Sequence, residues 1–176
     1  MSDTESTLRI INQMRDAGVI GNYAIGGAIG CAFYIEPTTT YDLDIFVPFE
    51  IAAGSSLVSL DHIFGYLIPL GYKTKGAKIQ IEGSDVDFLP ADDELLREAL
   101  LQAVDAKIGG VQTRVMTAEH LMALALRTGR GKDFIRLEQF FLHKAFNENR
   151  LTEILQRHNL IEKWHQFCDK YIRTGE

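Results

Sequence analysis

Cysteine is scarce in this sequence, since only Cys31 and Cys168 occur among its 176 residues. So little cysteine is typical of a reducing compartment, and neither residue has a second cysteine nearby with which to build a zinc site. Residues 1–5 include two acidic side chains and no basic one, which is the wrong start for a secretory signal. From these absences we expect a cytoplasmic protein.

Long apolar segments and an excess of positive charge are also missing. No run of about 18 uninterrupted apolar residues exists, so we expect no membrane span. The 18 lysines and arginines are outnumbered by 24 aspartates and glutamates, which gives a net charge of −6. A broad nucleic-acid-binding surface needs clustered basic residues, so this balance argues against one, although it is compatible with a local basic groove.

The motifs of other enzyme classes are absent or misplaced. No Gly-x-Ser-x-Gly occurs, so the nucleophile turn of a triad hydrolase is missing. Asp42 and Asp44 form an Asp-x-Asp pair, but polar residues 38–40 precede it, whereas haloacid-dehalogenase-like phosphatases place their pair after a continuous apolar strand. The 41 residues before the pair are too few for the nucleotide-binding region of an Asp-x-Asp glycosyltransferase.

The sequence does contain an ordered series of glycines and carboxylates, which begins with Gly26 and Gly27. An apolar run, 23–25, leads into these glycines, and the apolar segment 28–34 after them predicts a buried helix. A strand, a glycine turn and a helix place backbone N–H groups and the positive helix end where a phosphate can bind. Because glycine has no Cβ, a ligand can approach this backbone closely.

Two carboxylates follow on one predicted strand and a third on another. Residues 43–47 are rich in β-forming side chains, and alternation along a strand points Asp42 and Asp44 to the same side. Asp87 lies within the apolar run 86–89, the second strand of a predicted hairpin. Three acidic groups that converge repel each other, and hard cations such as Mg²⁺ or Mn²⁺ prefer oxygen ligands. These three aspartates are therefore the candidate metal ligands and catalytic residues.

Asp85 is an alternative to Asp87, because the two share one face of a strand and alternation cannot separate them. We choose Asp87 because it lies inside the apolar run, whereas Asp85 lies at the edge of the turn signal Gly83-Ser84.

In this order the features resemble the nucleotidyltransferases of the polymerase-beta-like superfamily. The similarity is greatest to the small bacterial branch that includes the abortive-infection type nucleotidyltransferase toxins. It is carried by segments 26–29, 38–44 and 127–133 and spans residues 22–140. The resemblance implies an α/β (α+β) fold with a mixed nucleotidyltransferase sheet flanked by helices and followed by a C-terminal helical segment.

The resemblance also implies an activity. Asp42, Asp44 and Asp87 would hold Mg²⁺ or Mn²⁺ and catalyse transfer of a nucleotidyl group from a nucleoside triphosphate to a hydroxyl group. The acceptor is left open between RNA such as tRNA, a protein and a small molecule. A toxin-like enzyme of this kind would have an antitoxin as a possible partner.

Five residues would bind the nucleotide, as the resemblance implies. Gly26 and Gly27 would seat the triphosphate, Thr40 would hydrogen-bond it or orient the carboxylate pair, and Arg130 and Lys132 would neutralise developing charge. We expect these two cations to serve binding rather than the fold, since a structural role would need a buried partner.

Two positions depart from the pattern of the branch. Ala28 stands where many relatives have a Ser or Thr that binds phosphate, and Thr38 stands where the toxins often have Arg. Both replacements would weaken the binding of a triphosphate. They support a second hypothesis, a nucleotide-binding, regulatory or interaction module that keeps the fold and has weakened catalysis.

Length and periodicity predict a mixed α/β core over residues 1–116 and a helical region over 117–176 that packs on it, and the resemblance implies that this core is the nucleotidyltransferase core. The predicted helices cover 6–18, 28–34, 57–68, 92–104 and the chain from Thr117 onward, and the predicted strands cover 23–25, 43–47, 78–82, 86–89, 106–108 and 111–115.

Overall fold

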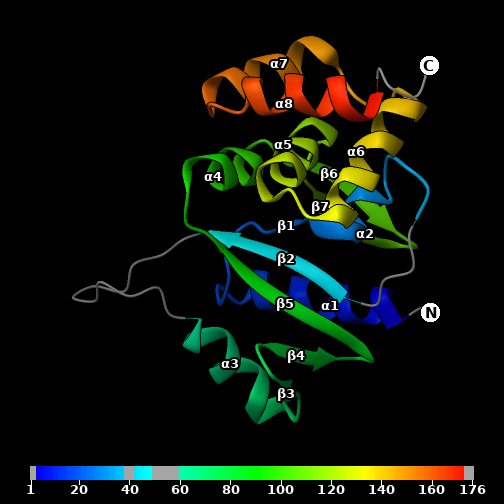
Figure 1. Cartoon of the computed structure of the whole chain (residues 1–176). Coiled ribbons are helices and arrows are strands. Elements are labelled where there is room, and N and C mark those ends of the chain that lie inside the picture. Colours follow the sequence, from blue (N-terminus) through cyan, green and yellow to red (C-terminus); the bar gives the residue numbers. More distant parts are fainter. Residues whose placement is uncertain (1–2, 38–41, 49–59, 173–176) are drawn as a thin grey trace.

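A mixed seven-stranded sheet forms the centre of the computed structural model, which describes residues 3–37, 42–48 and 60–172 (Figure 1). Its strand order is β3-β4-β5-β2-β1-β7-β6. The elements in chain order are α1 (Asp3–Asp16), β1 (Ala24–Ile25), α2 (Gly27–Cys31), β2 (Asp42–Pro48), α3 (Asp61–Leu67), a 3₁₀ turn (Ile68–Leu70), β3 (Lys73–Lys75), β4 (Lys78–Ile81), β5 (Ser84–Ala91), α4 (Glu94–Leu101), β6 (Val104–Ile108), β7 (Val111–Val115), α5 (Ala118–Thr128), α6 (Gly131–His143), α7 (Glu148–Arg157), α8 (Ile161–Phe167) and a π-helical turn (Cys168–Ile172).

Strands β2 and β5 form a long parallel pair in the middle of the sheet. Their register places Asp42 opposite Asp85 and Asp44 opposite Asp87. Strand β1 joins β2 antiparallel on one side and β7 parallel on the other, while β3-β4, β4-β5 and β6-β7 are antiparallel pairs. The predicted mixed α/β fold with flanking helices is confirmed.

Alternation along β2 decides which side chains meet which helices. Leu43, Ile45 and Val47 are buried in one hydrophobic cluster with side chains of α1 and α3. The opposite side of β2 carries Asp42, Asp44 and the partly buried Phe46, and this side faces the helices that follow β5 (Figure 1). The hydrophobic pattern therefore turns the carboxylate pair toward α4, α5 and α6.

Helix α1 is tied to the sheet by two polar contacts as well as by its apolar face. The Thr7 hydroxyl donates to the Ile81 carbonyl at 2.8 Å, and the Asn12 side-chain amide donates to the Gln112 carbonyl at 2.9 Å. The helix thus links β4 with β7 on the side of the sheet away from the carboxylates.

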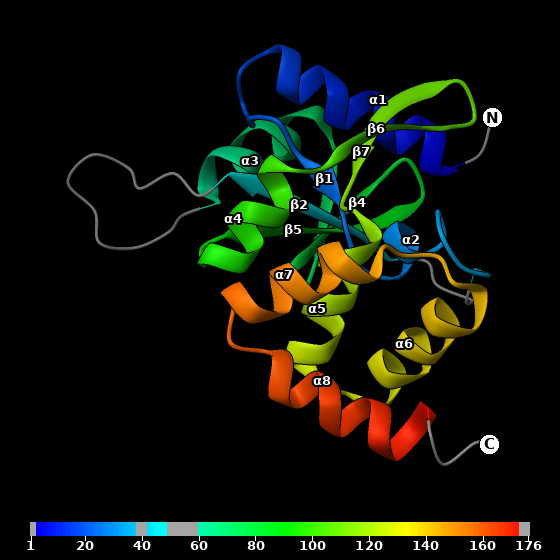
Figure 2. The same ribbon diagram turned by 90° about the horizontal axis from the view of Figure 1, so that it is seen from above.

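The C-terminal helices cover the other side of the sheet, and α5 is their centre. Its buried Leu121 and Met122 share one cluster with Ala24 of β1 and with side chains of α4, α6, α7 and α8. Figure 2 shows α5 among these helices and α8 at the end of the molecule opposite α1. No helix in the three described ranges is long and apolar enough to cross a membrane.

Several helix ends differ from the prediction. Helix α2 ends at Cys31 rather than at residue 34, and α4 ends at Leu101 because Val104 begins β6 and pairs with Val115. Strand β3 was not predicted, since its sequence Lys-Thr-Lys is polar and exposed on both sides. Leu60 precedes α3, and the predicted start of that helix at 57–59 lies outside the described residues.

Candidate active site

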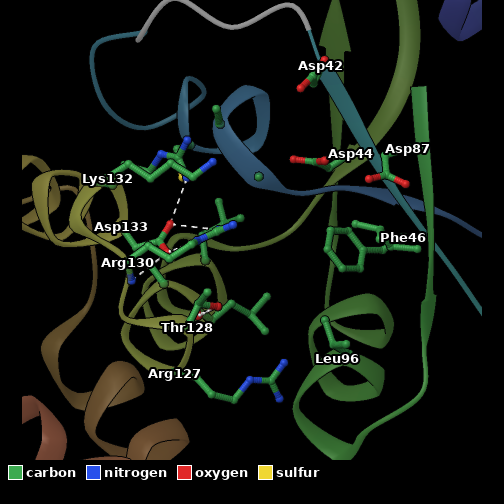
Figure 3. Close-up of a pocket in the computed structure, with 18 of the residues that line it drawn as sticks. Asp42, Asp44, Phe46, Asp87, Leu96, Arg127, Thr128, Arg130, Lys132 and Asp133 are labelled. Carbon is green, nitrogen blue, oxygen red and sulfur yellow. Dashed lines mark hydrogen bonds and ion pairs between the residues drawn. The ribbon is translucent and has the colours of Figure 1, made fainter. Parts of the chain in front are cut away.

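A cleft of about 440 Å³ lies between the carboxylate side of the sheet and helices α4, α5 and α6 (Figure 3). Three groups of side chains line it. The acidic wall consists of Asp42, Asp44 and Asp87; the basic wall consists of Arg127, Arg130, Lys132 and Arg136; the apolar floor consists of Phe46, Leu89, Leu96, Leu121, Leu124 and Ala125.

The sheet register brings the three predicted carboxylates to the acidic wall. Asp44 and Asp87 are direct neighbours across the parallel pair, and Asp42 lies two residues before Asp44 on the same side of β2. Asp85 does not line the cleft in the described part of the chain, and its carboxylate is 2.6 Å from the Lys75 ammonium group. The alternation that left Asp85 and Asp87 equivalent is thus resolved by their position along β5.

A lysine that the sequence reading passed over completes this wall. The Lys78 ammonium nitrogen lies 2.5 Å from Oδ2 of Asp42, and Lys78 also lines the cleft. Because Ile79 pairs with Val86 in the β4-β5 ladder, Lys78 projects to the same side of the sheet as its neighbour Asp87.

Charge repulsion is visible in the acidic wall. Burial raises the pKa of Asp44, and the charges of Asp87 and Asp42 raise it further. Burial likewise raises the pKa of Asp87, opposed by Lys78 and reinforced by Asp42. The hydrogen bond to Asp42 raises the pKa of Lys78 above its ordinary value. These groups therefore favour additional positive charge beside them.

The donor set fits a hard divalent cation, because it is made of carboxylate oxygens whose negative charges are only partly compensated. As the side chains stand, no three His, Cys, Asp or Glu groups of the described residues are arranged to hold one metal ion. Asp44 and Asp87 are already side by side, and Asp42 is engaged with Lys78.

The two glycines have different roles in this structure. Gly27 lines the cleft with a positive φ of 56°, and a Cβ added to it would overlap the Asp44 carboxylate. Gly26 is not part of the described lining; its N–H donates to the Asp44 carbonyl at 3.0 Å, and an added Cβ would meet the Phe46 ring at 2.5 Å. Gly26 thus holds β1 and β2 together beneath the site.

The basic wall is partly committed to internal ion pairs. Arg130 lies 2.7 Å and Arg136 lies 3.2 Å from the carboxylate of Asp133, whose side chain is only 2% exposed. The expectation that Arg130 lacks a buried partner is therefore wrong, because Asp133 is that partner and also receives the Arg130 backbone N–H at the start of α6. Lys132 is exposed at the rim of the cleft, across from the acidic wall (Figure 3).

Three further positions were singled out in the sequence. Ala28 lines the cleft. Thr40 and Thr38 lie outside the described residues.

No protein-family model matches the sequence, and no curated protein matches it. Solved structures do match. An antigenic nucleotidyltransferase-like protein from Paracoccidioides brasiliensis aligns over 95% of this chain and 91% of its own, with 15% identity and a TM-score of 0.55. The antibiotic-resistance factor ANT(2'')-Ia aligns over 94% of this chain and 99% of its own, with 16% identity and a TM-score of 0.53. The fold is a nucleotidyltransferase fold. Neither neighbour is described as an abortive-infection toxin, so the resemblance to that branch stays a prediction.

Arg127 also lines the cleft; it belongs to the segment 127–133 but was not among the five predicted nucleotide-binding residues. It lies 2.8 Å from Oδ2 of Asp93, whose other carboxylate oxygen accepts the Leu96 N–H at 2.9 Å and caps α4. The sequence signal for Asp93 was its position near a helix start, but its partner is 34 residues away, and only the packing of α4 against α5 brings them together.

Proposed function

We propose that this protein transfers a nucleotidyl group from a nucleoside triphosphate to a hydroxyl acceptor. One observation carries the proposal: an acidic wall and a basic wall face each other across one cleft of a nucleotidyltransferase fold. Neither wall alone would point to a triphosphate, since carboxylates repel phosphates and arginines are common on surfaces.

The dimensions and charges of the cleft suit a nucleotide. A volume of about 440 Å³ is in the range of small-ligand sites, which measure roughly 300–1,000 Å³. The basic wall supplies hydrogen-bond donors for phosphate oxygens, and Lys132 and Arg130 are exposed to solvent. The apolar floor, which includes Phe46 and Leu96, offers a surface for a base or a ribose.

Asp42, Asp44 and Asp87 would hold Mg²⁺ or Mn²⁺. When bound, the cation would neutralise phosphate oxygens and stabilise the attacking and leaving oxygens of an in-line displacement. Asp87 is the residue that would accept the proton of the acceptor hydroxyl. Lys132 would stabilise the negative charge of the departing pyrophosphate.

The acceptor would be an RNA such as tRNA, a protein or a small molecule. One structural neighbour is described as an antibiotic-resistance factor, and this places small hydroxyl compounds among the acceptors to test. A toxin-like action with an antitoxin partner belongs to the same proposal and rests on the sequence resemblance.

A second candidate is a nucleotide-binding or regulatory module with weakened catalysis. It is favoured by the methyl group of Ala28 in the cleft lining, which cannot hydrogen-bond a phosphate as the Ser or Thr of relatives does.

The test uses nucleoside triphosphates labelled at either the α- or the γ-phosphate, with Mg²⁺ or Mn²⁺ and with total tRNA, lysate protein or small hydroxyl compounds as acceptors. Nucleotidyl transfer leaves the α-label on the acceptor and releases the γ-label as pyrophosphate. Asp44→Asn is the matched inactive control. Nucleotide binding without transfer would favour the second candidate, and transfer of the γ-label instead would contradict both.

A further inference from the structure

Lys78 places a positive charge inside the acidic wall. Its ammonium nitrogen lies 2.5 Å from Oδ2 of Asp42, and the two side chains are only partly exposed, at 31% and 46%. Lysine side chains lose conformational freedom when held in this way, and an ion pair at such exposure contributes little to stability. The ion pair between Lys78 and Asp42 therefore has a role other than stabilising the fold.

The same ammonium group lies on the side of the sheet that carries all three carboxylates. It is bonded to Asp42, and Lys78 lines the cleft together with Asp42, Asp44 and Asp87. Register explains this, because Lys78 is the β4 residue next to Asp87, and Asp87 is opposite Asp44. A divalent cation held by the three aspartates would neutralise the same charges from the same side of the sheet.

We infer that Lys78 is a built-in counter-ion that occupies Asp42 until a divalent cation displaces it. This inference rests on the proposed function, because it takes the acidic wall to be the metal site. Lys78 and the cation compete, because two positive charges held beside the same Asp42 carboxylate repel each other.

The displaced ammonium group would keep its place in the cleft lining. A bound triphosphate then offers it phosphate oxygens in exchange for the Asp42 carboxylate. Cation and triphosphate would accordingly assist each other's binding through Lys78, beyond the direct contact between them.

The neighbouring strand supplies a matched control. Lys75 forms a 2.6 Å ion pair with Asp85, on the same β3-β4 hairpin and to the same strand β5, but Asp85 does not line the described cleft. Lys75→Gln and Lys78→Gln therefore remove the same charge from two similar pairs, of which only one involves the acidic wall.

The experiment measures Mn²⁺ binding to the whole protein without nucleotide, from the electron paramagnetic resonance signal of the free ion. Lys78→Gln should bind Mn²⁺ on the order of 5- to 10-fold more tightly than the wild type, as expected for removing one like charge from the site. Lys75→Gln should bind as the wild type does. Because removing the ammonium group leaves the three carboxylates without their counter-charge, added Mn²⁺ should raise the melting temperature of Lys78→Gln more than that of the wild type.

Each other outcome has a distinct meaning. Equal or weaker Mn²⁺ binding by folded Lys78→Gln overturns the counter-ion role while leaving the metal site intact. An equal gain in both lysine variants shows a general charge effect and also overturns it. If Asp44→Asn binds Mn²⁺ as tightly as the wild type, or if neither the wild type nor Lys78→Gln binds it, the metal site of the proposed function fails and the inference falls with it.

Discussion

The backbone of Gly27 lies directly against the carboxylate of Asp44. With its φ at 56° and no Cβ, Gly27 leaves the space that the Asp44 oxygen fills, and any L-side chain at that position would overlap it. The spacing between the glycine turn and the later carboxylate thus reflects a packing relationship within this molecule, in addition to any role in admitting a phosphate. Asp44 owes its position in the cleft to a residue on a different element.

Gly27→Ala should therefore damage the site more than the fold. The added methyl group displaces the Asp44 carboxylate and strains the left-handed backbone, at a cost of about 1–3 kcal/mol, and nucleotidyl transfer should fall by at least about ten-fold. Thermal melting and steady-state kinetics measure the two effects. Gly65→Ala on α3 is the control, because an added Cβ there meets nothing within 4 Å. Equal kinetics in the two variants would contradict the packing relationship.

Asp44→Asn should abolish metal-dependent transfer without loss of stability. Burial and two neighbouring carboxylates oppose the charge of Asp44, so an uncharged side chain of the same shape relieves repulsion in the metal-free protein. Its melting temperature in metal-free buffer should equal or exceed that of the wild type. Asp42→Asn should also abolish transfer but gain less stability, because it gives up the ion pair with Lys78. Wild-type activity in either variant would remove the site assignment.

Asp87→Asn should lower transfer by orders of magnitude, and Asp85→Asn should change it little. The reason is position: Asp87 neighbours Asp44 in the cleft, whereas Asp85 is paired with Lys75 outside it. Transfer rates of the two variants are compared at identical metal and nucleotide concentrations. A larger loss of rate in Asp85→Asn than in Asp87→Asn would mean that Asp85 is the third carboxylate of the site.

Arg130→Ala should mainly lower the stability of the protein, whereas Lys132→Ala should mainly weaken nucleotide binding. Removing Arg130 deprives the buried Asp133 of one of two arginine partners, so we expect a loss of about 1–3 kcal/mol, with Arg136 limiting the damage. Lys132→Ala should keep the wild-type melting temperature and raise the apparent KM for the nucleotide. A melting temperature that falls as far in Lys132→Ala as in Arg130→Ala would show that the whole segment is structural.

Stability should decrease in acid partly through Glu98, which binds three side chains from later in the chain, those of Arg157, His158 and His120. Hydrogen bonds from Arg157, His158 and His120 hold its pKa at about 2, below the ordinary 4.5. A folded pKa lower than the unfolded one gives stability that is present above pH 4.5 and lost as the pH falls toward 2. The full shift corresponds to on the order of 3 kcal/mol. Glu98→Gln should be less stable than the wild type at pH 7, and the difference between their unfolding free energies should shrink between pH 4.5 and 2; a constant difference would contradict this account.

Sequence reasoning located the elements whose pattern is local. Leu43 and Ile45 alternate with Asp42 and Asp44, so the strand, its buried side and the direction of its carboxylates could all be predicted, and the structure confirms the burial. The helix ends were less predictable. Val104 stands at the end of a predicted helix, but it belongs to β6 because it pairs with Val115, and the residues around Val104 do not indicate this pairing.

The residues that sequence reasoning missed or misread depend on distant contacts. Arg130 looked like an unpartnered cation on a glycine turn, because its partner Asp133 becomes buried only when α6 packs on α5. Lys78 could have been found, since a hairpin with its turn at residues 82–83 places residue 78 beside residue 87. Reading the register of the hairpin, and not only its two strands, would have added that lysine to the acidic wall.

The parallel pairing of β2 with β5 also has a consequence for how the protein is made. Asp42 and Asp44 leave the ribosome well before Asp87, and the two strands can pair only after α3 and the β3-β4 hairpin between them have been synthesised. Parallel strands cannot be joined by a tight turn, and closing a long connection costs chain entropy that local contacts do not repay. A nascent chain that stops before β5 therefore carries the first two carboxylates of the cleft without the third.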